Sequence, residues 1–326
     1  MAEKTNSYSE NISGNKLLYH LDRVQGIRAP ITADVFINNY CNNRCPYCTY
    51  KRWEHEAGAR YMDLGDFSMY ASRLYEMGVK GVILTGGGEP TLNPDFQGIT
   101  QWLDKAQMAY GINTNFNVYR ECRPEYLKVS LDAYDEDSYE ALRGVRMYEQ
   151  VCENIERYAA WKAVHSPKTS LGIQVVAIDA DTVNRFYMEN EHLPVDYIVF
   201  RPMESTGGEY YGENDAVRVK ELIKAVHMWK EKDKRVVLNY KFFQLGVKTP
   251  SCVANWAQIA IDEKGQVMYC CHKPYEIVGH IMDDDILAKK AAFKTDMSMC
   301  DVPCRMTDNN LFMQRIEAGT KNPFFI

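Results

Sequence analysis

The chain has 326 residues, 46% of them hydrophobic and 25% charged, with a formal net charge of −6. This composition suffices for one large core and a small appendage, and the acidic balance disfavours nonspecific binding of nucleic acid. No stretch approaches 18 consecutive apolar residues and the N-terminal segment is polar, so we expect a cytoplasmic protein with neither a membrane span nor a secretion signal. Ten cysteines in that compartment favour metal or redox chemistry over disulfides.

Short apolar runs alternate with longer helical patterns between Ala33 and Met203, which is typical of repeated β-α units around a parallel sheet. The helix after the first unit illustrates the pattern, because Asp63 suits its N-cap and Gly78 suits its C-terminal end. We therefore predict an α/β fold, a partial (β/α)6 barrel similar to a TIM barrel, with ligands at the carboxyl ends of the strands. The predicted strands are 35–37, 82–84, 110–113, 127–131, 171–178 and 197–200.

The chain divides into four predicted parts. A charged helical segment, 214–234, separates the alternating region from a cysteine-rich region in which 258–261 and 267–269 form a predicted hairpin. The parts are an N-terminal extension (1–30), the partial barrel (31–205), a connecting helical segment (206–250), and a small β-hairpin-plus-helix domain with the C-terminal tail (251–326).

Three cysteines, Cys41, Cys45 and Cys48, follow the first strand in the pattern Cys-x3-Cys-x2-Cys. Three thiolates can hold three irons of a [4Fe-4S] cluster and leave the fourth iron open to a small molecule. The alternative is zinc, but tetrahedral zinc needs four ligands. The nearest spare candidate, His55, lies in a charged run that is more typical of a solvated helix face.

Two further strand ends carry candidate ligand contacts. The second predicted strand runs directly into Thr85-Gly-Gly-Gly-Glu-Pro90, and glycines at a strand end let a ligand approach the backbone closely. The fourth ends in Ser130-Leu-Asp132, where Asp132 is also suited to cap a helix. Arg143 follows, and its planar guanidinium can bind a carboxylate through two hydrogen bonds.

Together the cysteine triad and the glycine motif resemble the signature of the radical S-adenosylmethionine (radical SAM) enzymes. The resemblance implies that the open iron binds S-adenosylmethionine and that reductive cleavage yields a 5'-deoxyadenosyl radical, which takes a hydrogen atom from the substrate. It also implies an external one-electron reductant such as flavodoxin or ferredoxin. The resemblance also implies that Tyr47 packs against the adenine and that Arg143 binds the carboxylate. The full set of cofactor contacts that it implies is Tyr47, Gly87, Gly88, Glu89, Asn113, Ser130 and Arg143.

Four cysteines in the last part of the chain form a second set, with Gly265 at the hairpin turn between the first two. They resemble the Twitch module, the shorter form of the SPASM domain, which implies one auxiliary [4Fe-4S] cluster; their spacing alone also permits structural zinc. Cys271 is an alternative to its neighbour as a ligand. The predicted ligands are Cys252, Cys270, Cys300 and Cys304.

The remaining candidates are single residues. Cys122, Cys152 and Cys271 are outside both sets, and a free cysteine is usually a small buried hydrophobe. Cys271, beside a predicted ligand, is the best candidate for donating a hydrogen atom to a substrate radical, as in an epimerase. Arg201, at the end of the sixth strand, is placed to bind a substrate or handle a proton.

The sequence therefore predicts a metal-binding radical SAM oxidoreductase or epimerase that acts on a polar small molecule of the sugar, aminocyclitol or nucleoside type. A second interpretation is a SPASM/Twitch-type maturase that modifies a ribosomally made peptide. A third is a non-enzymatic iron-sulfur electron-transfer protein. That last interpretation would leave an open-iron site and its cofactor motifs without a role.

Overall fold

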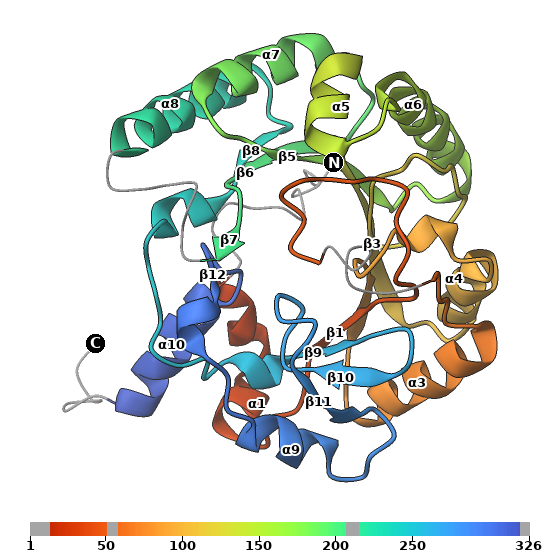
Figure 1. The fold of residues 1–326 in the computed structure, drawn as a ribbon, viewed down its shortest axis with the longest axis vertical. Coiled ribbons are helices and arrows are strands. Elements are labelled where there is room, and N and C mark those ends of the chain that lie inside the picture. Colours follow the sequence, from red (N-terminus) through yellow and green to blue (C-terminus); the bar gives the residue numbers. More distant parts are fainter. Residues whose placement is uncertain (1–13, 51–57, 207–214, 320–326) are drawn as a thin grey trace.

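The computed structural model describes residues 14–50, 58–206 and 215–319, so His55 lies outside the described residues. In these ranges ten strands form one sheet, in the order β11-β10-β9-β1-β2-β3-β4-β5-β6-β8. Figure 1 shows the sheet curving around the centre of the molecule, with α3 to α8 outside it. The mixed α/β partial barrel with a parallel sheet is confirmed. None of the described helices is long and apolar enough to cross a lipid bilayer.

The strands are short. A separate pair, β7 and β12, forms a two-stranded antiparallel sheet. The strand bounds are β1 (Thr32–Val35), β2 (Gly81–Leu84), β3 (Ala109–Thr114), β4 (Tyr126–Ser130), β5 (Ser170–Val176), β6 (Tyr197–Arg201), β7 (Ser205–Thr206), β8 (Val236–Leu238), β9 (Gln258–Ile261), β10 (Gln266–Met268), β11 (Ile277–His280) and β12 (Asp301–Val302).

The helices alternate with the strands through the barrel. Five short 3-10 helices occur at η1 (Gly14–His20), η2 (Pro90–Leu92), η4 (Tyr240–Gln244), η5 (Asn255–Ala257) and η6 (Met297–Met299) among the described residues. The α-helices are α1 (Leu21–Gln25), α3 (Leu64–Glu76), α4 (Phe96–Lys105), α5 (Glu136–Arg143), α6 (Tyr148–His165), α7 (Ala180–Asn190), α8 (Ala216–Lys232), α9 (Ile286–Ala292) and α10 (Thr307–Ala318).

The six predicted strands correspond to β1 to β6, with one displaced: 35–37 was predicted where β1 covers Thr32–Val35. Two more strands lie parallel in the same sheet within the described ranges. β8 pairs with β6, and β9 pairs with β1. The prediction missed β8 because three apolar residues carry too little periodicity, and it could not see that β9 joins β1 because strand pairing is not a local property.

Side chains of β1 alternate between two environments. Ala33 and Val35 belong to the main core, where they pack with Leu74 of α3 and the other buried residues between sheet and helices. Asp34 faces the other side of the sheet, where it accepts hydrogen bonds from Gln258 and Arg305. The cap prediction for α3 is confirmed, since Asp63 accepts a 2.8 Å hydrogen bond from the Asp66 amide.

Candidate cluster and cofactor sites

The cysteine triad lies on the loop after β1, at the carboxyl end of that strand. Cys45 is buried and Cys41 and Cys48 are half-buried. Burial, with Glu89 and the other two thiols acting in the same direction, raises the pKa of the Cys41 thiol to about 12. A metal that binds here must therefore displace a proton from Cys41.

Asparagine side chains at the end of β3 also hold the cysteine loop. The sequence analysis did not identify them. Asn115 donates a 2.7 Å hydrogen bond to Asn42 and lies 3.8 Å from the Cys41 sulfur. Asn117 donates a 2.7 Å bond to Asn43. The signal was present, because every second residue from Asn113 to Asn117 is asparagine at the end of β3, where side chains face the ligand edge of a parallel sheet.

An aspartate connects three of the predicted cofactor contacts. The Asp132 carboxylate accepts a 2.6 Å hydrogen bond from the Tyr47 hydroxyl and a hydrogen bond from Arg143. Arg143 also donates to the Ser130 carbonyl at 2.6 Å and lies 3.5 Å from the Cys45 sulfur. Burial alone would lower the Arg143 pKa, but the Asp132 carboxylate holds it well above its usual value. Tyr47 and Arg143 therefore meet at Asp132, and Ser130 joins them through its carbonyl bond with Arg143.

The Glu89 carboxylate is buried and turned toward the protein. It accepts hydrogen bonds from the amide and hydroxyl of Thr91, the hydroxyl of Thr114 and the amide of Asn115. Burial raises its pKa, while these donors act in the opposite direction. The side chain thus ties the glycine motif to the end of β3 and is occupied by protein donors.

The backbone of the glycine motif packs directly on the cysteine loop. The Glu89 amide donates a 2.8 Å hydrogen bond to the Tyr40 carbonyl, and Asn38 donates 2.7 Å to the Glu89 carbonyl. A Cβ atom on Gly88 would lie 2.1 Å from the Tyr40 oxygen, so only glycine permits this approach. Gly87, beside it, is buried.

Among the described residues, three polar atoms at this edge are buried and have no hydrogen-bond partner. They are Nδ2 of Asn43, Oδ1 of Asn113 and Nε of Arg143. The Asn113 amide nitrogen donates to Thr85 at 3.1 Å, which leaves its oxygen to accept from a ligand. An acceptor and a donor beside three thiols fit an amino acid group bound to an open iron, as S-adenosylmethionine would provide.

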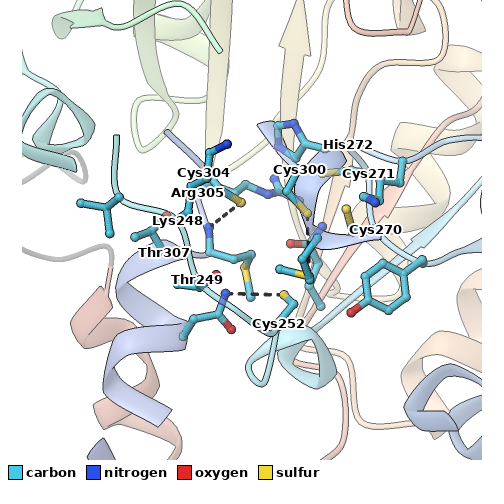
Figure 2. A pocket seen from close by; sticks show the side chains of 17 residues that line it. Lys248, Thr249, Cys252, Cys270, Cys271, His272, Cys300, Cys304, Arg305 and Thr307 are labelled. Atoms are coloured by element: carbon cyan, nitrogen blue, oxygen red, sulfur yellow. Dashed lines mark hydrogen bonds between the residues drawn. The ribbon is translucent and has the colours of Figure 1, made fainter. Parts of the chain in front are cut away.

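Figure 2 shows that the second cysteine set faces one pocket. Asn310 donates to the Cys252 sulfur at 3.5 Å, and the Met306 amide donates to the Cys304 sulfur at 3.3 Å. Burial raises the pKa of Cys252 to about 11 and that of Cys270 to about 12. The pocket brings together all four predicted ligands, Cys252, Cys270, Cys300 and Cys304, with Cys271 beside them.

The two sites differ from a mononuclear centre in geometry. Over the stretches of chain that the structure describes, no group of three or more His, Cys, Asp or Glu side chains is arranged to hold a single metal ion. A [4Fe-4S] cluster calls for a wider set, because each thiolate binds a different iron.

The free cysteines occupy apolar surroundings. Cys122 and Cys152 pack in or against the core between the sheet and the helices. Cys271 is buried in a small cluster with Phe36 and Met268, against which Tyr50 packs.

Arg201 takes part in a charged cluster around one buried carboxylate. Its guanidinium lies 3.3 Å from Glu204, which also pairs with Lys241 and lies 3.5 Å from His272. Burial alone would raise the pKa of Glu204, but these cationic groups hold it well below its ordinary value. The end of β6, η4 and the segment after β10 therefore converge on Glu204.

Residues 35–161 match the family model of the Radical SAM superfamily. This range includes the cysteine triad, the glycine motif and Arg143. The chain carries a radical SAM domain. Its match to that family confirms the resemblance seen in the motifs.

The curated relatives of the radical SAM domain include GTP 3',8-cyclases. The protein of that name from Haemophilus influenzae (strain PittEE) is 28% identical over 131 residues, which cover 37% of this chain and 39% of the relative. The one from Pectobacterium atrosepticum is 25% identical over 187 residues, covering 54% and 56%. The chain thus spans about two fifths of the length of the first relatives it matches.

Two solved structures resemble the fold over most of the chain. Streptococcus suis SuiB bound to S-adenosylmethionine has a TM-score of 0.62 at 14% identity, covering 88% of this chain and 75% of SuiB. The structure named anSMEcpe with bound AdoMet has a TM-score of 0.59 at 18% identity, covering 86% and 91%. These likenesses show that the fold is shared over most of the chain.

Proposed function

We propose that this radical SAM protein is an enzyme that cleaves S-adenosylmethionine reductively and abstracts a hydrogen atom from a polar small molecule, which is then oxidised or epimerised. The observation that carries the proposal is the presence of three thiols, the unfilled Asn113 oxygen and the unfilled Arg143 nitrogen at one edge of the sheet. When bound, a [4Fe-4S] cluster with S-adenosylmethionine supplies the 5'-deoxyadenosyl radical. An external one-electron carrier such as flavodoxin or ferredoxin would supply the reducing electron.

The protein's own residues would hold and orient these groups. Cys41, Cys45 and Cys48 would bind three irons. Asn113 would accept from the amino group of S-adenosylmethionine and Arg143 would donate to its carboxylate. The backbone of the glycine motif would complete the methionine contacts, while the ring of Tyr47, fixed by its bond to Asp132, would pack against the adenine.

A second [4Fe-4S] cluster is proposed on the four cysteines of the pocket in Figure 2. Four protein thiolates would leave no iron open, so this cluster would handle electrons and would not bind substrate. Cys271, buried beside the pocket, is the proposed hydrogen donor if the reaction is an epimerisation.

The charged cluster supports a substrate with an anionic group. Arg201 and Lys241 carry two positive charges against the single negative charge of Glu204, and Nε of Arg201 is buried with no hydrogen-bond partner in the described ranges. A guanidinium with an unused N–H can bind a carboxylate or phosphate. A sugar or nucleoside phosphate would satisfy it, and the curated relatives are named for a nucleotide, GTP.

The second candidate is a peptide maturase. It is favoured by the likeness to a structure of SuiB bound to its precursor peptide SuiA, which covers 88% of this chain. A purely electron-transferring protein is the third candidate, and it would leave the Asn113 oxygen and the Arg143 nitrogen without a function.

The test is anaerobic reconstitution followed by iron and sulfide analysis and incubation with reductant, S-adenosylmethionine and substrates. We expect 5'-deoxyadenosine from the unmodified protein and from Cys122→Ala, and none from Cys45→Ala. Phosphorylated sugars and nucleotides should increase its formation more than peptides do. Stimulation by peptides alone would favour the maturase, and no 5'-deoxyadenosine under any condition would reject the enzyme.

A measurement of stoichiometry separates the two outcomes for the substrate. Oxidation consumes one S-adenosylmethionine per product, whereas an epimerisation that regenerates the cofactor consumes less. If Cys271 is the hydrogen donor, Cys271→Ala should still form 5'-deoxyadenosine but should lose the epimerised product.

A further inference from the structure

A buried lysine lies beside the pocket of the second cysteine set. Lys290, on α9, is only 6% exposed, whereas its neighbour Lys289 lies on the outer side of the helix and pairs with Asp283 at 2.9 Å. The Lys290 ammonium donates a 2.8 Å hydrogen bond to the Asn255 carbonyl and lies 5.6 Å from the centre of the Tyr269 ring. No carboxylate in the described part of the chain pairs with it.

The groups that act on this ammonium are thiols. Cys252, Cys270 and Cys271 are the acidic groups close enough to favour its charged form, against the burial that lowers its pKa to about 8. Lys290 and Cys252 also line one cavity of about 540 Å³, with Tyr269 between β10 and α9 in the same wall. Lys290 thus lies in the wall of a cavity that one cysteine of the second set also lines.

Other cations around that pocket are compensated or exposed. Lys273 pairs with Glu276 at 2.9 Å, and Arg305 pairs with Asp34. Lys248 is exposed to solvent. Lys290 is buried in the wall of the cavity that Cys252 lines, and no carboxylate of the described residues neutralises its charge.

We propose that the Lys290 ammonium raises the reduction potential of the auxiliary cluster. The inference rests on the second [4Fe-4S] cluster of the proposed function. Reduction adds a negative charge, and a buried cation stabilises that charge more strongly than the same cation would in water. The hydrogen bonds from Asn310 to Cys252 and from the Met306 amide to Cys304 act in the same direction.

The two cluster sites differ in the charged groups beside them. At the first site the buried Glu89 carboxylate acts on Cys41, and the cation near Cys45, Arg143, is paired with Asp132. We expect the auxiliary cluster to have the higher potential of the two. A higher potential suits an electron acceptor, and so favours oxidation over epimerisation as the outcome for the substrate.

The experiment is a redox titration of the full holoprotein followed by electron paramagnetic resonance. S-adenosylmethionine changes only the signal of a cluster with an open iron, so the signal that does not respond to it belongs to the auxiliary cluster. The variants are Lys290→Met, which removes the charge at similar volume, and Lys290→Arg, which retains it. Lys289→Met, one position earlier on the same helix, is the matched surface control.

We expect the auxiliary potential to shift to a more negative value in Lys290→Met, to stay near that of the unmodified protein in Lys290→Arg, and to change little in Lys289→Met. The inference would be overturned if the auxiliary cluster had the same reduction potential in Lys290→Met as in Lys289→Met. If Lys290→Met loses four irons, Lys290→Gln is measured instead. Loss of the same four irons in Lys290→Gln would also overturn the inference, because the lysine would then be needed to hold the cluster.

Iron analysis of the unmodified protein tests the auxiliary cluster separately from the effect of Lys290 on its potential. Eight irons are expected per chain, four in each of two [4Fe-4S] clusters. Four irons, or zinc at the second set, would reject the auxiliary cluster and the inference together. Eight irons with an unchanged potential in Lys290→Met would reject the inference alone.

Discussion

The Tyr47 hydroxyl donates a 2.6 Å hydrogen bond to Asp132, which lies 85 positions later in the chain. Tyr47 precedes the last cysteine of the triad, and Asp132 follows β4 with a backbone φ of +58°. The same carboxylate accepts from Arg143 and, through its other oxygen, from the Val176 amide at 2.7 Å. Asp132 thus fixes the cysteine loop relative to three elements of the barrel.

Replacing Asp132 with alanine should strongly destabilise the protein. It would leave the Arg143 guanidinium buried without its carboxylate, and breaking a buried pair from one side costs about 3–5 kcal/mol. Chemical denaturation measures the free energy of unfolding. Arg146→Ala, which removes an exposed arginine paired with Asp137 and Glu140, is the control and should have a much smaller effect. Equal effects of the two variants would contradict the role of Asp132.

Tyr47→Phe should separate the hydroxyl from the ring. The variant loses a hydrogen bond to a charged group, which is worth about 1.5–3 kcal/mol, but it retains the aromatic face. We expect a lower unfolding free energy with largely preserved binding of S-adenosylmethionine, whereas Tyr47→Ala should weaken binding as well. Equilibrium dialysis of the reconstituted protein measures this difference, and equal affinities for all three proteins would remove the proposed adenine contact.

Gly144 lies at the end of α5 and packs against the cysteine loop, so Gly144→Ala should disturb that loop. Gly144 caps α5 with φ of +72°, and a Cβ atom there would lie 2.8 Å from the Arg44 carbonyl, between Cys41 and Cys45. Gly246→Ala is the matched control, because Gly246 has φ of +79° but nothing within 4 Å of a new Cβ. Both variants bear a left-handed backbone cost of about 1 kcal/mol, and only Gly144→Ala should also lose iron from the first site. Normal iron content in both would show that the contact with Arg44 is dispensable.

Metal uptake at the first site should increase with pH. The Cys41 pKa is raised to about 12 in the metal-free chain, so the thiol is protonated at neutral pH and must release its proton to become a ligand. Each released proton makes the affinity rise about tenfold per pH unit below that pKa. Anaerobic reconstitution with Fe²⁺ and sulfide at a series of pH values, with the bound iron measured, checks the slope in a protein whose second cysteine set is replaced. Cys122→Ala should have the same slope even though the Cys122 pKa is also about 12, since Cys122 lies in the core. A pH-independent affinity would be evidence against Cys41 as a ligand.

Much of the architecture could be read from local patterns. The apolar runs of β1 to β6 alternate with amphipathic helices, and Asp63 and Gly78 mark the ends of α3, because strand and cap preferences act over a few residues. The Cys-x3-Cys-x2-Cys spacing predicted the radical SAM family, because one short loop supplies all three thiolates.

The alternation of strands and helices, the cysteine motifs and the match to the radical SAM model are thus legible in the order of residues. Three relationships appear only in the folded chain: β9 continues the barrel beside β1, Asp132 joins Tyr47 to Arg143, and Lys290 of α9 lies against the pocket that Cys252 lines. These relationships connect residues far apart in the chain, and they depend on which faces pack together and which charges are buried without partners. Those properties arise from long-range packing, so no local pattern of residues encodes them.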